Sequence, residues 1–261
     1  MCWFRNKIRQ IRWREILSGA LLVFISVWGG RAYLTPEEGR TSPIALEVYI
    51  YRPAVMLAGR RGFYEPDQSA FPKVNDFLQG QLASLDPAEW PETIPRDSSP
   101  YTHASEYHLY LNYTVALFWR LFGISHKSLE PLAIALLCWT ALAAYGIMRL
   151  GMGKILSFLL ALVFTFSPPV LLLLPSLRDF SKAPFLLSLI FALGYLVHYC
   201  RNSKGLLFWA IALGVLHGVA MGFRQDALIF TPLVLVVLLV VSALIYRLQD
   251  VTNNHKLVVR S

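Results

Sequence analysis

The sequence is poor in charge and in cysteine. Charged residues make up 15% of the 261-residue chain, whereas a soluble domain usually carries about 25%. A chain with so few charges is not expected to cover itself with a water-soluble surface. Its three cysteines, Cys2, Cys138 and Cys200, are far apart, and this spacing provides neither a disulfide framework nor a zinc-ligand pattern.

Several functional patterns are also missing. The sequence has no glycine-rich phosphate-binding loop, so nucleotide hydrolysis is not expected. No Cys, His and Asp residues stand at the spacing of metal ligands, and His198 and His217, within apolar runs, are expected to be packing residues. We therefore expect no cofactor, although a divalent metal ion stays open. The apolar runs do not alternate, which argues against a membrane β-barrel.

Long apolar runs dominate what is present. Hydrophobic residues make up 56% of the chain, and several runs approach the ~20 residues that a helix needs to cross a bilayer. We predict an all-α, polytopic integral membrane protein with about six transmembrane helices. The predicted spans cover residues 16–30, 129–149, 155–175, 183–200, 205–223 and 227–247.

The distribution of charge orients these spans. The formal net charge is +8, but Lys and Arg cluster beside the apolar runs, which is typical of topology signals and lipid headgroup contacts rather than of nucleic-acid binding. Arg149 with Lys154, and Arg201 with Lys204, fall on the same predicted side as the basic N-terminus. This bias predicts that both termini are cytoplasmic. The first span is expected to be uncleaved, since no small-residue cleavage site follows it.

Residues 31–127 are predicted to form a long first extracytoplasmic loop. Within it, Pro43–Leu57 and Val74–Leu85 are predicted as short amphipathic helices on the membrane surface. The aromatic run Tyr107–Phe122 is short for a span and fits an interfacial helix better. The chain is thus expected to be a single membrane domain, 1–261, with a helical bundle over 128–247 and a cytoplasmic tail over 248–261.

Several polar residues fall on the predicted outer side of the membrane. They are Glu37, Glu38, His103, Arg178, Asp179, Lys182, Arg224 and Asp226. Ionisable groups at membrane depth are costly and are often functional. The cations suit a lipid phosphate, and a carboxylate partly shielded from water suits a general base. Two simpler explanations stay open: the glutamates begin a surface helix, and the 178–182 turn holds an ordinary local ion pair.

The order of several short motifs resembles a known family. Residues 34–40, LTPEEGR, resemble the LTP-D-E-x-R type of motif that follows the first span of GT-C membrane glycosyltransferases, the group related to protein O-mannosyltransferases and the lipid A aminoarabinose transferase. Further likenesses follow in order: SPYTH at 99–103 and LFG at 121–123, then SPP at 167–169 leading to Arg178 and Asp179, and GVAMGFRQD at 218–226. Glu37 stands where the family usually has an aspartate. The resemblance spans about residues 10–247 and implies a truncated or minimal member.

The resemblance implies a GT-C-like fold and sugar transfer from a polyprenyl-phosphate donor to a glycan, lipid or protein acceptor, outside a bacterial inner membrane. Glu37 would be the base, with Glu38 in support. Arg224, Arg178 and Lys182 would bind the donor phosphate, while Asp179, His103 and Asp226 would orient the substrates. The partners expected are membrane lipid and these substrates, not nucleic acid. Two rivals stay open, a transporter or flippase for a lipid-linked substrate and a non-catalytic assembly subunit.

Overall fold

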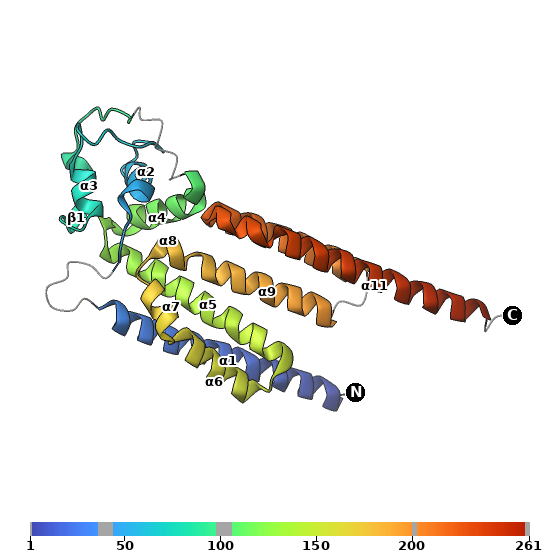
Figure 1. Cartoon of the computed structure of the whole chain (residues 1–261). Helices are drawn as coiled ribbons and strands as arrows, with labels where there is room; N and C mark the ends of the chain where they lie inside the picture. Colours follow the sequence, from blue (N-terminus) through green and yellow to red (C-terminus); the bar gives the residue numbers. More distant parts are fainter. Residues whose placement is uncertain (1, 36–43, 98–105, 200–202, 259–261) are drawn as a thin grey trace.

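The computed structural model describes residues 2–35, 44–97, 106–199 and 203–258. In these ranges the regular structure is helical, apart from the strands β1 (Ser84–Leu85) and β2 (Ile124–Ser125), which pair antiparallel. Figure 1 shows long helices lying side by side, with a group of short helices at one end of them. The predicted all-α class is confirmed for the described ranges.

Five long helices form most of the bundle. They are α1 (Cys2–Leu34), α5 (Glu130–Gly151), α9 (Lys182–Tyr199), α10 (Ser203–Phe223) and α11 (Thr231–Val258). The helix α5 packs against both α1 and α9. Gly194 of α9 permits close contact with α5, because a Cβ there would lie 2.6 Å from a methyl group of Leu150.

Five segments in the described ranges are long and apolar enough to cross a membrane. They are Glu15–Leu34, Lys127–Gly151, Leu177–Tyr199, Lys204–Phe223 and Gln225–Tyr246. The two segments after residue 203 are only 11% and 17% buried, against 61% for the segment that contains α5. An apolar helix with so little of its surface covered is compatible with a lipid environment, and the chain is compatible with a multi-pass membrane protein.

The predicted span over 155–175 is interrupted. The helix α6 (Lys154–Thr165) stops before Ser167, and α7 (Pro168–Leu173) and the four-residue α8 (Leu177–Phe180) follow. Ser167 has an extended backbone with ψ 147°, as expected of a residue before proline. At about 18 Å, α6 is shorter than the ~30 Å hydrocarbon core of a bilayer. The α6–α8 segment nevertheless returns the chain to the end of the bundle beside α2 and α4. The helix α1 begins and α11 ends on the side away from the cap, and α11 extends beyond the other helices (Figure 1).

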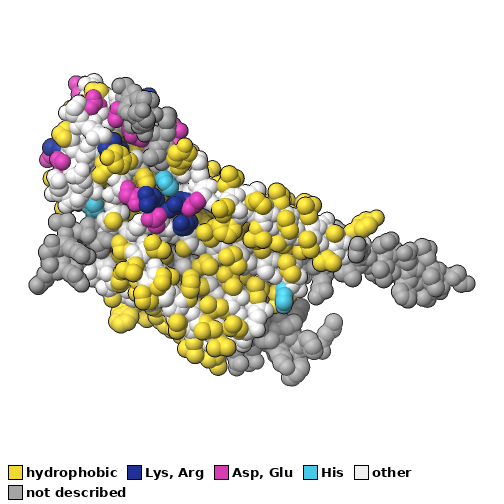
Figure 2. All heavy atoms as spheres, viewed as in Figure 1, with side chains coloured by type: hydrophobic (Ala, Val, Ile, Leu, Met, Phe, Trp, Pro, Cys, Tyr) yellow, Lys and Arg dark blue, Asp and Glu magenta, His cyan; other side chains and the backbone are white. Residues whose placement is uncertain are grey.

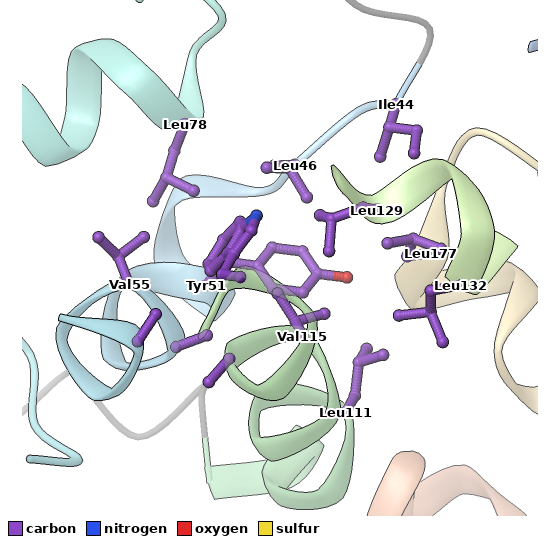
Figure 3. Close-up of a cluster of buried hydrophobic side chains, with 14 of the residues drawn as sticks. Ile44, Leu46, Tyr51, Val55, Leu78, Leu111, Val115, Leu129, Leu132 and Leu177 are labelled. Carbon is purple, nitrogen blue, oxygen red and sulfur yellow. The ribbon is translucent and has the colours of Figure 1, made fainter. Parts of the chain in front are cut away.

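The short helices form a cap, defined as residues 44–97 and 106–129. Its helices are α2 (Val48–Ala58), α3 (Lys73–Leu78), α4 (Leu109–Phe122), and the 3-10 turns η1 (Pro87–Glu89), η2 (Glu106–His108) and η3 (Lys127–Leu129). The helix α2 is buried at eight of its 11 residues. Figure 3 shows Tyr51 and Val55 of α2 among Leu111 and Val115 of α4. The prediction that α2 rests on the membrane surface is therefore wrong: apolar residues surround its axis, so it is the core of the cap.

The helix α4 is amphipathic, as predicted for an interfacial helix. Its inner face buries Leu111, Val115 and Trp119. Its outer face exposes large apolar and aromatic side chains at a spacing of three or four residues: Tyr110, Tyr113, Leu117 and Leu121. At about 21 Å it is too short to span a bilayer, and its contact with a membrane stays a prediction.

Candidate functional site

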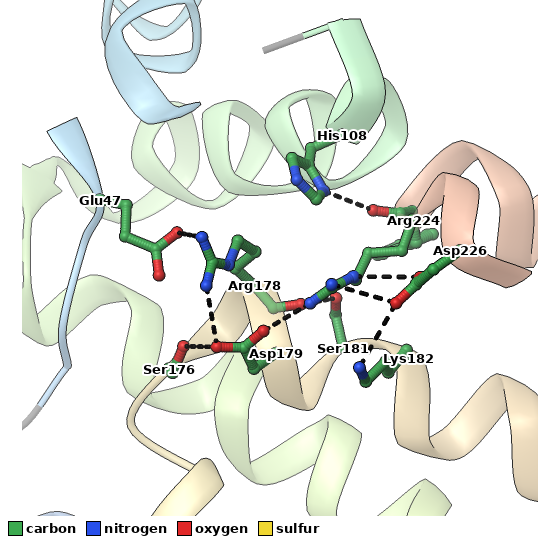
Figure 4. A network of polar contacts seen from close by, with 10 residues as sticks. Glu47, His108, Ser176, Arg178, Asp179, Ser181, Lys182, Arg224 and Asp226 are labelled. Carbon is green, nitrogen blue, oxygen red and sulfur yellow. Dashed lines mark hydrogen bonds and ion pairs between the residues drawn. The ribbon is translucent and has the colours of Figure 1, made fainter. Parts of the chain in front are cut away.

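Six charged side chains form a continuous series of alternating sign where the cap meets the bundle. In order of contact they are Glu47, Arg178, Asp179, Arg224, Asp226 and Lys182 (Figure 4). We call this series the ion chain. In Figure 2 these charges gather in one patch below the cap, on a face that is otherwise mostly apolar.

Arg178 links the cap to the bundle. Its Nη1 lies 3.0 Å from Oε2 of Glu47, and its Nη2 donates to Oδ2 of Asp179 at 3.2 Å. The Glu47 contact has the distance of an ion pair but not the angle of a hydrogen bond, so Oε2 is buried without a hydrogen-bond donor among the described residues. Ser176 Oγ donates to the same Asp179 oxygen at 3.2 Å. Asp179 is therefore fixed from two sides.

Arg224 forms the other half of the ion chain. Its Nη1 donates to Oδ1 of Asp179, and its Nη2 lies 3.0 Å from Oδ2 of Asp226. Lys182 Nζ reaches the same Asp226 oxygen at 3.4 Å. The Arg224 side chain is 19% exposed, whereas Asp226 is 45% exposed, so the ion chain runs from a shielded centre to an open edge.

Short backbone contacts hold these side chains in place. The strand-like segment before α2 is bonded to the residues before α8, because Ala45 N–H donates to Pro175 C=O at 3.1 Å. The short helix α8 is anchored by its buried residues Leu177 and Phe180. Since Glu47 follows two residues after Ala45, this pairing places its carboxylate beside Arg178.

The end of α10 is held against α4. His108 Nδ1 donates to the carbonyl of Phe223 at 3.1 Å, immediately before Arg224. Gly222 allows this approach, since a Cβ there would lie 2.0 Å from Cδ2 of Tyr110. Arg224 then leaves the helix with an extended backbone, φ −154° and ψ 125°, which turns its side chain toward Asp179.

Burial changes the protonation of the cap residues at this site. Burial raises the pKa of Glu47, and the nearby Arg178 and Arg224 oppose that shift. The pKa of His108 is lowered, chiefly by burial and with help from the same arginines. Burial also raises the pKa of Tyr51, whose hydroxyl has no partner among the described residues. His108 is therefore neutral at pH 7, and Glu47 accepts a proton more readily than a free glutamate does.

The ion chain balances three cations with three carboxylates. An entering anion must compete with the carboxylates for the arginines. Protonation of Glu47 would leave the ion chain with one excess positive charge. The arrangement can therefore bind a phosphate when Glu47 is neutral, and it can hold the cap on the bundle when no anion is present.

The structure brings together five of the residues predicted from the sequence: Arg178, Asp179, Lys182, Arg224 and Asp226. Their roles with a substrate stay predictions. Glu37, Glu38 and His103 lie outside the described residues. Sequence reasoning missed Glu47, although a single acid in the apolar stretch from Ile44 to Leu57 is the kind of residue that marks a site.

Other features of the described ranges lie apart from the ion chain. Two cavities, of about 470 and 590 Å³, are lined by none of its residues. Among the described residues, no group of three His, Cys, Asp or Glu side chains is arranged to hold a metal ion. No family model, curated protein or solved structure matches the chain.

Proposed function

We propose that this protein is an integral membrane glycosyltransferase of GT-C type, which transfers a sugar from a polyprenyl-phosphate donor to an acceptor on the outer face of the membrane. The observation that supports the proposal is the ion chain, which gathers Arg178, Arg224 and Lys182 at one end of a bundle of apolar helices. A phosphate on a membrane lipid is the anion most available at such a place.

The topology proposed is six crossings with both termini cytoplasmic. The interrupted α6–α7 segment would be the crossing between α5 and α9, with α6 packed on α5 and α1, and α7 in contact with α6 and α8. Proline breaks in spanning helices are tolerated where side chains satisfy the freed backbone groups, and Ser167 Oγ donates to the carbonyl of Phe164 at 2.7 Å. The helix α1 begins and α11 ends on the side away from the cap, which suits an ion chain on the outer face.

The chemistry proposed has two parts. A carboxylate removes the proton from an acceptor hydroxyl, whose oxygen attacks the anomeric carbon of the sugar. The bond from that carbon to the phosphate oxygen breaks, and the electron pair stays on the phosphate. Arg178 and Arg224 would stabilise the charge left there. Glu37, supported by Glu38, is the base that the resemblance implies, and Glu47 is the alternative within the described residues.

A non-catalytic assembly subunit is the second candidate. It is favoured by the complete pairing of the ion chain, since each cation already has a carboxylate partner. In that case the sole role of the ion chain would be to dock the cap on the bundle. A subunit of this kind would bind no donor phosphate, whereas the enzyme would release polyprenyl phosphate.

The test is a reconstituted transfer assay. The full chain in liposomes is offered a panel of radiolabelled polyprenyl-phosphate sugars, and release of polyprenyl phosphate is measured. The wild type should release it. Arg224→Gln should lose at least about tenfold in rate, the effect of one lost charge-assisted hydrogen bond. Arg96→Gln, which removes an exposed cap arginine over Tyr64, should not change the rate. No release with any donor, or equal release by the Arg224 variant, would reject the enzyme.

A further inference from the structure

A second polar cleft lies at the end of the cap away from the ion chain. It has a volume of about 470 Å³, and its lining includes Arg60, Arg120, Asp86, Ser84 and Phe122. The helix α2 runs between the two places, since Glu47 precedes its first residue and Ala58, its last, lines the cleft. An 11-residue helix is about 16 Å long, so the cleft is a separate site.

Arg120 is held in a fixed position in this cleft. Its Nε donates to the carbonyl of Leu57 at 3.0 Å, and its Nη2 donates to the same oxygen. A guanidinium has five N–H groups, so Nη1 and the second hydrogen on Nη2 remain for a ligand. Because the group is already fixed by Leu57, binding would cost little side-chain entropy.

Arg60 has an unusual backbone. It follows the end of α2 with φ 62°, the one positive φ of a non-glycine residue in the described ranges. The left-handed region costs a side-chain-bearing residue roughly 1–2 kcal/mol, and glycine would occupy it without that cost. Arg60 is exposed, and its guanidinium makes no ion pair with any described carboxylate. An arginine in a conformation suited to glycine points to a use for its side chain.

The lining of the cleft carries a net charge, whereas the charges of the ion chain balance. Asp86 is the acid that lines it, and its Oδ1 accepts from Ala88 N–H at 2.9 Å, so it caps η1. In the described part of the chain, neither Arg60 nor Arg120 is paired with a carboxylate. The lining therefore carries one excess positive charge, and an entering anion need not displace a protein carboxylate. Two arginines that line one cleft suit the oxygens of a phosphate.

The apolar edge of the cleft indicates how that phosphate arrives. The exposed face of α4, formed by Tyr110, Tyr113, Leu117 and Leu121, leads to Phe122, which lines the cleft and is 61% exposed. Aromatic and leucine side chains on one face of a helix suit the boundary between lipid headgroups and acyl chains. We infer that the cleft binds the phosphate headgroup of an anionic lipid, while α4 contacts its acyl chains. This inference does not depend on the proposed transferase activity.

Native mass spectrometry of the full chain in a neutral detergent tests the inference. Dihexanoyl phosphatidic acid is titrated against the wild type, with dihexanoyl phosphatidylcholine and glycerol 3-phosphate in parallel. The acid should bind at one saturable site and at least about tenfold more tightly than either comparison ligand, because it alone combines an anionic headgroup with acyl chains. Equal binding of phosphatidylcholine, or of glycerol 3-phosphate, would overturn the lipid-phosphate assignment.

Variants locate the bound lipid. Arg60→Gly removes the guanidinium and suits the backbone, so it should fold normally and bind phosphatidic acid about tenfold more weakly. Arg120→Gln should weaken binding similarly, and thermal unfolding checks that the cap survives. Arg96→Gln is the matched control for an exposed cap arginine and should bind as the wild type does. An unchanged affinity in Arg60→Gly, or the same loss in Arg96→Gln, would overturn the site.

Discussion

Glu47 and Arg178 join the cap to the helical bundle through an ion pair of 3.0 Å. Glu47 lies just before α2, the buried helix of the cap, and Arg178 lies in α8 at the end of the bundle. The backbone pairing of Ala45 with Pro175 brings the two segments together. Because burial raises the pKa of Glu47, docking of the cap is coupled to the protonation of this carboxylate.

Replacement of Glu47 by glutamine should change how stability depends on pH. A raised pKa in the folded state means that the unfolded chain loses its proton first, so the wild type loses stability as the pH rises from about 4.5 through the raised value. Glu47→Gln has no proton to lose there. The melting temperature of Glu47→Gln minus that of the wild type, measured in detergent at pH 4, 5, 6 and 7, should therefore increase as the pH rises. A constant difference across this range would show that Glu47 ionises normally.

His108 should make stability depend on pH in the opposite direction. Its pKa is lowered, chiefly by burial, so folding favours the neutral ring, and the stability that depends on it is lost as the pH falls below the ordinary value of 6.5. The comparison of His108→Gln with its parent is best made in the Glu47→Gln background, where the other titration is absent. Between pH 7 and pH 5, the melting temperature of the Glu47→Gln parent should fall more than that of the variant that also carries His108→Gln. Parallel curves would contradict the shift.

The sequence predicts one half of the ion chain better than the other. Arg178, Asp179, Arg224 and Asp226 interrupt apolar runs, where charges are costly enough to mark a site. Glu47 was missed because its contact with Arg178 depends on the pairing of Ala45 with Pro175. A contact between segments so far apart in the chain leaves no local pattern.

The helices likewise divide into those that the local sequence predicts and those that it does not. The apolar runs predict α1, α5, α9, α10 and α11 because length and composition decide them. Hydropathy averaged over residues 155–175 hides the break at Ser167, although the Pro168-Pro169 pair alone predicts it. The sequence predicts α2 at the membrane surface because no local pattern shows that other parts of the cap bury eight of its 11 residues.

The contact between Arg224 and Asp179 should contribute more to the free energy of unfolding than an exposed ion pair does. The Arg224 side chain is 19% exposed, so the pair is neither fully exposed nor fully buried. Exposed ion pairs contribute ~0–1 kcal/mol to stability, whereas a buried charge that loses its partner costs ~3–5 kcal/mol. We expect Arg224→Met to lower the free energy of unfolding by about 1–3 kcal/mol. The measurement is reversible unfolding in mixed micelles by tryptophan fluorescence.

A double-mutant cycle isolates the pair. Asp179→Asn and the double variant complete the cycle, and the double variant should lose less than the sum of the two single losses. Lys182→Met, which removes a cation at the open edge, should cost less than Arg224→Met. Additive losses would mean that the two residues stabilise the protein separately.

Gly222 and Gly218 offer a matched pair of substitutions on α10. A Cβ at Gly222 would lie 2.0 Å from Cδ2 of Tyr110, whereas a Cβ at Gly218 would meet no atom within 4 Å. Gly222→Ala should therefore push α4 away from α10 and lower the free energy of unfolding by about 1–3 kcal/mol, the usual cost of overpacking. Gly218→Ala should be neutral or raise it by up to about 1 kcal/mol, because alanine has the higher helix propensity. Tyr110→Ala should restore part of the stability that Gly222→Ala loses. If both alanine variants unfold like the wild type, then α4 does not pack on the end of α10, and His108 is not held against Phe223 beside Arg224.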